Sequence, residues 1–329
     1  MLVLNREAVT ASLGHAECVE LMEGAMRAVS RRDVVMPLRQ FMAVPDTKGK
    51  LGMMPGYVGK TDQSDSVFGI KVVSKFPREP GSPHSSHVGA VLLFETNDGL
   101  PVALMDGREL TAIRTAATTA MATRVLARDD AASLTLIGCG EEARHHIQAI
   151  LPVRPIKKII VWGRNADRAQ TFADQQNLPD SVSIQVEPDI QKATSEAEIL
   201  CTVTSSTQPI LKGEWLQPGV HVNLVGAAVR ASAEADTEVV KRSRFYVDYQ
   251  PSAVEQAGEL VNAIEAGVVT EDHIAGEIGA VLNNEVSGRA SMDEITVYKS
   301  LGVSAQDLAA GMAAAENAKA GNIGIAVDW

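Results

Sequence analysis

The sequence has few cysteines and no long apolar run. Its 329 residues include three cysteines, Cys18, Cys139 and Cys201, which share no close spacing. Such usage argues against a disulfide framework or a zinc site and is typical of a reducing cytoplasm. No stretch approaches the roughly 20 apolar residues that cross a bilayer, and the start, MLVLNREAV, lacks a basic region ahead of an apolar segment. We therefore expect no membrane span, no secretory signal and a cytoplasmic location.

Positive charge is also scarce. The 30 lysines and arginines are outnumbered by 41 aspartates and glutamates, which gives a formal net charge of −11 at pH 7. This balance disfavours nucleic acid or an anionic membrane as a partner, so any anionic ligand must be held by locally placed cations. The composition, 45% apolar and 22% charged, is ordinary for a globular protein, and the length suffices for roughly two domains. We expect a protein that acts on small molecules.

The first hundred residues alternate helix and strand patterns. Residues 15–31 carry apolar residues at helical spacing. The stretch 96-TNDG-99 lies between two apolar runs, and Asp-Gly in that position is typical of a hairpin. We therefore expect an α+β arrangement with a largely antiparallel sheet. Its expected strands are 35–44, 51–58, 67–76, 88–95 and 101–106.

From residue 109 the pattern changes. Residues 109–128 are alanine-rich, contain no glycine or proline, and predict one long helix. Strand and helix patterns then alternate, which indicates an α/β fold with a doubly wound parallel sheet. A last helix is predicted at 303–321, with Ser304 as its N-cap, and we expect it to pack on the first part of the chain. The strands expected in the parallel sheet are 133–138, 158–162, 182–186, 198–203, 220–225 and 244–249.

A glycine-rich loop follows the first of these parallel strands. The segment 134-LTLIGCGEEARHH-146 places Gly138, Gly140 and Ala143 in a G-x-G-x-x-A pattern between a strand and a helix. The glycines permit a tight turn and close approach of the backbone to a pyrophosphate, and the helix N-terminus adds unpaired N–H groups. A plain strand-to-helix turn is the alternative, but it would not need both glycines. The pattern in this context favours a dinucleotide site.

The end of the second parallel strand indicates which dinucleotide. An NAD site usually has Asp or Glu there for the ribose hydroxyls, but this chain reads 161-VWGRNADRA-169. Arg164, Asn165 and Arg168 cluster where a 2′-phosphate would lie, and arginine pairs well with phosphate oxygens. We therefore expect NADP(H) to be preferred, with NAD(H) as the alternative. A solvated helix start is the other interpretation, above all for Arg168.

Three cations outside the dinucleotide region stand in unusual positions. Arg39 lies within PLRQF, Lys71 alternates with apolar residues in GIKVV, and Arg114 interrupts an alanine-rich helix. A cation in the middle of such a helix needs water or an anion, and a substrate carboxylate is a natural partner. A surface charge and an internal ion pair are the alternatives for each. No metal-ligand spacing emerges, so we expect no metal.

Six segments spread over most of the chain carry a family resemblance. They are 70-IKVVSKFP-77, 102-VALMDGRELTAIRTAATTA-120, 135-TLIGCGEEAR-144, 207-TQPIL-211, 219-GVHVNLVG-226 and 294-EITVYKSLGVSAQDLAA-310. Together they resemble the ornithine cyclodeaminase/mu-crystallin family. The resemblance implies a homodimer. It also implies that residues 1–112 with 304–329 form a discontinuous α+β domain for substrate binding and dimerisation, and that residues 113–303 form a Rossmann-type domain.

The same resemblance implies the residues of the site. Lys71 and Arg114 look like catalytic residues, with Arg114 as the main binder of a substrate carboxylate. Residues implied to line the substrate pocket are Arg39, Met54, Ser86, His87, Gly226, Ala227 and Ala228. Residues implied to line the dinucleotide are Thr115, Gly138, Gly140, Glu141, Glu142, Ala143, Arg164, Asn165, Arg168, Val203, Thr204, Ser205, Val225 and Ser300.

One departure from the family separates two reactions. Ornithine cyclodeaminases carry an aspartate base just after the VG of the fifth segment, where this chain has Ala228. The sequence therefore resembles the ketimine reductases of the family, which transfer a hydride from NAD(P)H to a C=N bond beside a carboxylate. We expect a reductase of imino acids such as 1-pyrroline- or 1-piperideine-2-carboxylate. The alternatives are an amino-acid dehydrogenase or N-alkyl amino acid-forming reductase acting on 2-oxo acids, an ornithine cyclodeaminase, and a non-catalytic protein that binds ligands with NADPH.

Overall fold

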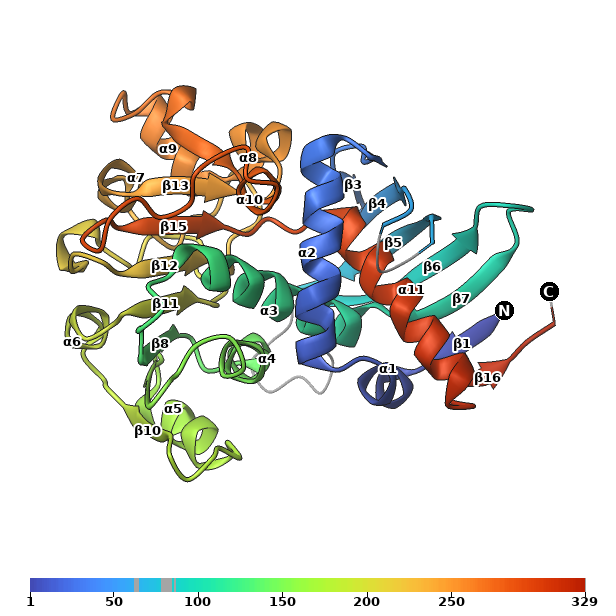
Figure 1. The fold of residues 1–329 in the computed structure, drawn as a ribbon, viewed down its shortest axis with the longest axis horizontal. Helices are drawn as coiled ribbons and strands as arrows, with labels where there is room; N and C mark the ends of the chain where they lie inside the picture. The colour runs from blue at the N-terminus through green and yellow to red at the C-terminus, as the bar shows by residue number, and fades with distance from the viewer. Residues whose placement is uncertain (62–64, 78–84, 86, 329) are drawn as a thin grey trace. The chain divides into compact units, whose positions relative to one another are not determined.

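The chain forms two compact units, each with its own sheet (Figure 1). The computed structural model describes residues 1–61, 65–77, 85 and 87–328. Unit 1 comprises Met1–Arg114 and Val303–Trp329, and unit 2 comprises Thr115–Gly302. The expected α/β class is confirmed, with a parallel, doubly wound sheet in unit 2 and a discontinuous α+β arrangement in unit 1.

The sheet of unit 1 has the strand order β16-β1-β7-β6-β5-β4-β2, with β3 paired to β4. All neighbouring strands in this sheet pair antiparallel, except that β1 and β7 pair parallel to each other. The expected antiparallel character is therefore confirmed. Three helices of unit 1 are α1 Arg6–Ser12, α2 His15–Arg31 and α11 Ser304–Ala320. The strands are β1 Leu2–Leu4, β2 Val34–Val35, β3 Gln40–Ala43, β4 Lys50–Val58, β5 Val67–Lys75, β6 His87–Glu95, β7 Pro101–Asp106 and β16 Ile325–Ala326.

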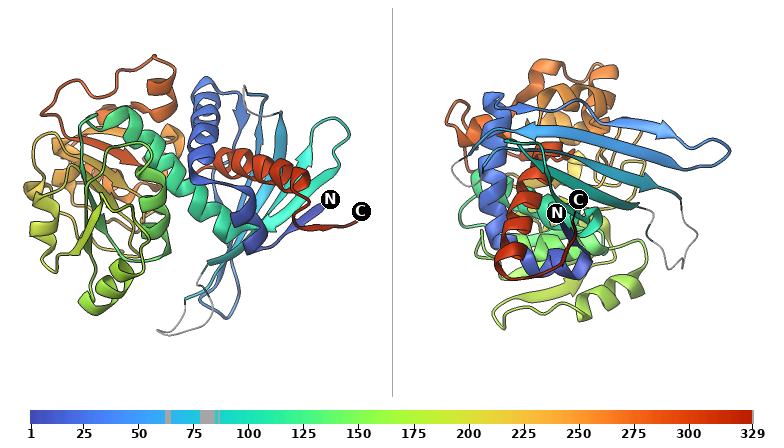
Figure 2. Two further views of the ribbon diagram at one scale, coloured as in Figure 1. Left: turned by 60° about the horizontal axis from the view of Figure 1, so that its bottom comes forward. Right: turned by 90° about the vertical axis from the view of Figure 1, so that its right-hand side faces the viewer.

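Helix α11 packs on one face of this sheet, and α2 packs on α11 (Figure 2). Small residues make the close approach to the sheet possible. A Cβ on Gly56 would lie 2.5 Å from Oγ of Ser304, and one on Gly69 would lie 3.1 Å from Cδ2 of Leu308, both on α11. Glycine at these two strand positions therefore lets the alanine-rich helix lie directly on β4 and β5.

The predicted start of the last helix is wrong by one residue. Ser304 is the first helical residue, and Val303, which has extended backbone angles, holds the N-cap position without a side-chain hydrogen bond. The hydroxyl of Ser304 is instead buried and has no hydrogen-bond partner among the described residues. The close packing of α11 on β4 takes precedence over the local capping preference of serine.

The face of the sheet opposite α11 is also apolar. Side chains alternate between the faces of a strand, so the residues beside the α11-facing ones point the other way. Phe68 and Phe94 stack there with ring centroids 5.2 Å apart. Further apolar residues on this outer face are Leu51, Met53, Tyr57, Ile70, Val72, Leu92 and Leu104. An antiparallel sheet that faces water usually carries polar side chains on that side.

Unit 2 contains a parallel sheet of eight strands in the order β10-β9-β8-β11-β12-β15-β13-β14. The chain leaves β8 towards β9 on one side and later returns to β11 on the other, which creates the switch point typical of dinucleotide-binding sheets. Its strands are β8 Ser133–Ile137, β9 Lys158–Trp162, β10 Ser183–Val186, β11 Ile199–Thr202, β12 His221–Leu224, β13 Arg244–Val247, β14 Ile274–Glu277 and β15 Thr296–Lys299.

Helix α3, Gly107–Leu126, begins in unit 1 and ends in unit 2. Its last carbonyl groups are bound by arginines: Nη2 of Arg154 donates to the carbonyl of Arg124 at 2.7 Å, and Nε of Arg289 donates to that of Leu126 at 2.8 Å. These contacts satisfy the carbonyls that a helix end leaves unpaired. The other helices of unit 2 are α4 Glu141–Ile150, α5 Ala166–Asp174, α6 Ile190–Ser195, α7 Thr237–Arg242, α8 Gln250–Gln256, α9 Gly258–Glu265 and α10 Ile278–Leu282, with 3-10 turns at Gly213–Trp215 and Glu271–His273.

Most predicted elements are confirmed, including the helix at 15–31, the hairpin around 96–99 and the six parallel strands. The long helix is also confirmed, although it begins two residues earlier and ends two residues earlier than expected. The predicted run 35–44 is divided into β2 and β3. The sequence reading missed β1, β14, β15 and β16, which have four residues or fewer and too few alternations to stand out. No helix of the described chain has the length and apolar character that a membrane crossing requires.

Candidate active site

A buried cluster of three charged residues lies in unit 1. Nζ of Lys71, on β5, is 3.0 Å from Oδ1 of Asp307, and Nε of Arg114, on α3, donates to the same oxygen at 2.8 Å. Asp307 lies on α11 and is fully buried, while Lys71 and Arg114 are 5% and 3% exposed. Of the alternatives left open by the sequence, an internal ion pair is present for both cations. Two positive groups and one carboxylate leave this buried cluster with one excess positive charge.

The surroundings set the protonation of these groups. Burial lowers the pKa of Lys71 to about 8; Asp307 opposes this effect, and Arg114 adds to it. Lys71 therefore keeps its proton below about pH 8 and loses it as the pH rises further. Burial alone would raise the pKa of Asp307, but Arg114 and Lys71 hold it below its usual value. The second oxygen of Asp307, Oδ2, has no hydrogen-bond partner among the described residues.

Three predicted pocket residues surround this cluster. Nε of Arg39 contacts Sδ of Met54 at 3.3 Å, and Met54 lies directly opposite Lys71 in the register of β4 and β5. His87 begins β6; partial desolvation, followed by Lys75, Lys71 and Arg108, lowers its pKa to about 4. The imidazole is therefore neutral near pH 7. Ser86, also predicted here, lies outside the described residues.

Two residues of this cluster were missed by the sequence reading. Asp307 pairs with both cations, and Oε1 of Gln306 accepts a hydrogen bond from Nη1 of Arg114 at 2.8 Å. Both lie in the first turn of α11, in the motif SAQDLAA. The available signal was an adjacent amide and acid in a helix otherwise built of small and apolar residues. An acid in a first turn is also common for electrostatic reasons alone, so this signal is weak.

The glycine-rich loop of unit 2 has the geometry that its motif predicts. Gly138 follows β8 with φ of +125°, and a Cβ there would lie 2.8 Å from the carbonyl oxygen of Val203. Gly140 is the N-cap of α4, makes no side-chain cap, and a Cβ there would meet nothing within 4 Å among the described residues. Ala143 is fully buried between helix and sheet. The loop therefore leads into a helix N-terminus, the arrangement that binds anionic groups in proteins.

The residues after β9 form the neighbouring part of this edge. Oδ1 of Asn165 accepts from the backbone N–H of Arg168 at 2.8 Å, so Asn165 caps α5. Arg164 and Arg168 are exposed. A Cβ on Gly163 would lie 2.9 Å from Sγ of Cys139, which places the start of this loop beside the glycine-rich loop. Arg164 and Arg168 therefore flank the edge on which the dinucleotide motif lies.

The remaining predicted cofactor residues lie at the carboxyl ends of neighbouring strands. Thr204 follows β11, Val225 and Gly226 follow β12, and Ser300 follows β15, and these three strands are adjacent in the sheet. Val203, Val225 and Ser300 are buried, and Ser205 is exposed. Thr115, on α3, is 8% exposed. Ala227 is buried, whereas Ala228 is partly buried and packs against the apolar core of the unit.

Comparison with known proteins assigns the family. The model of the ornithine cyclodeaminase/mu-crystallin family matches residues 1–322. The chain belongs to this family. A mouse family relative, ketimine reductase mu-crystallin of Mus musculus, is 32% identical over 277 residues, which cover 84% of this chain and 83% of the relative.

Solved structures of the family show the same arrangement. A Thermococcus litoralis Delta(1)-pyrroline-2-carboxylate reductase in complex with NADH and L-proline has a TM-score of 0.92 and 30% identity, covering 99% of this chain and 100% of that one. An archaeal alanine dehydrogenase dimer with bound NAD has a TM-score of 0.90 and 28% identity, covering 100% and 99%. The fold is therefore shared over the whole length of this family member.

The charge cluster can be tested through stability. Asp307→Asn should lower the free energy of unfolding by about 3–5 kcal/mol, because two buried cations lose the carboxylate that they share. Adding Lys71→Met should recover part of this loss, since it removes one of the two cations that Asp307 contacts. Urea unfolding at pH 7 measures both effects.

Asp65→Asn is the matched control, because it breaks the exposed ion pair with Lys60 and should change stability by less than about 1 kcal/mol. A loss of that small size for Asp307→Asn would contradict the interpretation. The interpretation would also be contradicted if the double variant lost as much stability as Asp307→Asn and Lys71→Met lose together as single variants.

Proposed function

We propose that the protein is an NAD(P)H-dependent reductase of imino acids that carry a carboxylate beside the C=N bond. The observation that carries this proposal is the buried Lys71–Asp307–Arg114 cluster, whose excess positive charge suits an anionic substrate in a chain of net charge −11. The names of the mouse relative and of the Thermococcus litoralis structure support the same reaction.

For this reaction the protein has to bind the substrate carboxylate and supply one proton. A nicotinamide cofactor supplies the hydride when bound. The guanidinium of Arg114, already oriented by Asp307 and Gln306, binds the substrate carboxylate through charge-assisted hydrogen bonds. Nζ of Lys71 holds a proton below about pH 8 and keeps the imine nitrogen in its protonated, electrophilic form.

The segment after β12 fits reduction better than deamination. Gly226, Ala227 and Ala228 offer no acid or base at the edge where cyclodeaminases of the family hold an aspartate. A protonated imine accepts a hydride without help from a base, so this absence does not hinder reduction.

Arg114 provides the kinetic test. Arg114→Ala should lower kcat/KM for 1-pyrroline-2-carboxylate by about 100-fold or more, because positioning and charge pairing of the carboxylate are lost together. The rate is followed as consumption of NADPH. Arg31→Ala, which removes an exposed cation from α2, should leave the kinetics unchanged. Unchanged kinetics in Arg114→Ala would overturn the assignment.

An amino-acid dehydrogenase is the second candidate, favoured by the likeness to the archaeal alanine dehydrogenase. The same cations would bind a 2-oxo acid, and ammonia or an alkylamine would form the imine. Assays of cyclic imines against 2-oxo acids with ammonia or methylamine distinguish the two candidates. Conversion of ornithine to proline without added cofactor would indicate a cyclodeaminase, and NADPH binding without turnover of any substrate would indicate a binding protein.

We further propose that NADP(H) is preferred over NAD(H). The support is the pair of exposed arginines, Arg164 and Arg168, after β9, together with the lack of an acid at that strand end. The two solved relatives contain NADH and NAD, so the preference is a property that we assign to this chain.

Titration with the two reduced cofactors tests this preference. The wild-type protein should bind NADPH at least about tenfold more tightly than NADH, and Arg164→Ala should remove most of the difference, since an arginine–phosphate pair is charge-assisted. Lys192→Ala, an exposed cation on α6, is the control and should leave both affinities unchanged. Equal binding of the two cofactors by the wild type would refute the preference.

We also propose that the outer face of the unit 1 sheet is the contact surface of a homodimer. Phe68 of β5 and Phe94 of β6 stack on this face, and the strands around them present apolar side chains away from α11. A second copy of the chain is the partner that carries an equally apolar, matching face, as a symmetric dimer requires. The archaeal relative described as a dimer supports this arrangement.

The mass in solution tests the dimer. By light scattering the wild type should have twice the mass of one chain, and Phe68→Glu should shift it towards the monomer, because a carboxylate would be buried unpaired. Val268→Glu places the same charge on an exposed apolar position of unit 2 and should leave the mass unchanged. A monomeric wild type, or a dimeric Phe68→Glu, would contradict the proposal.

A further inference from the structure

A second buried charge cluster lies in unit 2, at the carboxyl ends of the strands. Glu234 is fully buried, and its carboxylate accepts four hydrogen bonds. Oε1 accepts from the backbone N–H and the hydroxyl of Thr204, both at 2.7 Å. Oε2 accepts from the hydroxyl of Thr202 at 2.7 Å and from the backbone N–H of Gly226 at 2.6 Å. One side chain thereby ties the end of β11 to the end of β12.

Two further buried charged groups, Glu259 and Lys299, lie next to Glu234 along a chain of contacts. The backbone N–H of Glu234 donates to Oε1 of Glu259 at 2.9 Å, and Glu259 pairs with Nζ of Lys299 at 2.8 Å. Lys299 also donates to the carbonyl oxygen of Ala227 at 2.6 Å. Glu259 and Lys299 are both fully buried, on α9 and β15. The segment 226–227 is thus bound on one side by a carboxylate and on the other by an ammonium group.

The backbone at Gly226 is closely packed and has no space for a Cβ. A Cβ at this position would lie 2.1 Å from the carbonyl oxygen of Thr204 and 2.6 Å from Oε1 of Glu234. The backbone after β12 therefore lies directly against the backbone after β11. A change in the hydrogen bonds of Glu234 would move these two segments relative to each other.

A function for this cluster follows from its place at the carboxyl ends of β11 and β12. In an open parallel sheet the dinucleotide lies along the carboxyl ends of the strands at the switch point. The glycine-rich loop after β8 and the arginines after β9 serve the phosphates and the adenosine half. The ends of β11 and β12 lie on the other side of β8, so they face the other half of the cofactor. On the basis of the proposed cofactor, we propose that Glu234 is a positioning residue that sets the surface on which the nicotinamide half binds.

The two backbone N–H groups that reach Glu234 can only donate, one to each oxygen, so they favour a carboxylate there. All four groups that reach Glu234 donate, and an ionised carboxylate accepts at both oxygens. Glutamine has the same shape, but its amide nitrogen would face donors in place of one oxygen. Glu234→Gln therefore sets its amide nitrogen against one backbone N–H, that of Thr204 or that of Gly226, while it leaves the packing volume unchanged.

The test separates the two halves of the cofactor. Glu234→Gln should weaken the binding of NADPH by at least about tenfold, because one backbone N–H at the end of β11 or after β12 loses its charged acceptor and faces another donor. It should leave the binding of 2′-phospho-ADP-ribose, which lacks the nicotinamide, within about twofold of wild type. Both affinities are measured by calorimetry on the full chain. An equal loss for both ligands, or no loss for NADPH, would overturn the proposal.

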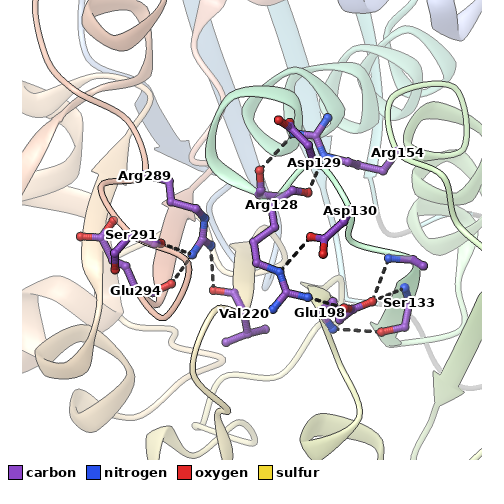
Figure 3. A network of polar contacts seen from close by, with 12 residues as sticks. Arg128, Asp129, Asp130, Ser133, Arg154, Glu198, Val220, Arg289, Ser291 and Glu294 are labelled. Carbon is purple, nitrogen blue, oxygen red and sulfur yellow. Dashed lines mark hydrogen bonds and ion pairs between the residues drawn. The ribbon is translucent and has the colours of Figure 1, made fainter.

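Glu198→Gln is the matched control. Glu198 accepts from the backbone N–H groups of Ala132 and Ser133 at 2.8 and 3.0 Å and pairs with Arg128, at the opposite edge of the same sheet (Figure 3). The substitution should lower thermal stability and leave both affinities unchanged. An effect of Glu198→Gln on NADPH binding equal to that of Glu234→Gln would show a general loss of structure and would overturn the positioning role.

Thr202→Val tests the same point if Glu234→Gln does not fold. It removes one donor to Oε2 and should weaken NADPH binding in the same direction by about threefold, without a change for 2′-phospho-ADP-ribose. Equal affinities for NADPH in wild type and Thr202→Val would count against the proposal. Failure of the proposed function has a different signature: the wild-type protein would then bind neither NADPH nor NADH, or would bind NADPH without reducing any imino acid.

Discussion

The ion cluster around Asp307 is the constraint on which unit 1 depends. Asp307 is 236 residues from Lys71 and 193 from Arg114 in the sequence, yet one carboxylate oxygen contacts both cations. A buried charge without a partner is costly, so β5, α3 and α11 fit together well only in the register that joins these groups. The same contact orients Arg114 and lowers the cost of keeping two cations away from water, which a binding site for an anion needs.

Unit 2 also contains a buried cluster of charged residues, in which acidic groups outnumber basic ones. Glu259 pairs with Lys299 and accepts from the backbone N–H of Glu234, so two buried carboxyl groups accompany one buried ammonium group. These groups bind backbone atoms at the ends of β11 and β12 and hold two loops together. In both units a few contacts of buried charged groups join residues that are far apart in the chain.

The regular elements were predictable because their signals are local. Apolar periodicity identified α2, α3 and the longer strands, and the G-x-G-x-x-A pattern identified the turn after β8. The short strands β1, β14, β15 and β16 were missed, since each is held in place by its sheet neighbours more than by its own pattern. The start of α11 was misplaced because close packing on Gly56 overrode the preference of Ser304 for a cap.

The sequence by itself determined the class of fold, the place of the dinucleotide motif and the three unusual cations. Each of these follows from residue type and spacing within a short window. The tertiary structure decided what neutralises Lys71 and Arg114, which groups anchor the loops after β11 and β12, and that the sheet of unit 1 has two apolar faces. Asp307, Glu234 and Lys299 look like ordinary charged residues in the sequence. Their roles depend on burial and on contacts between residues far apart in the chain, which only the folded structure creates.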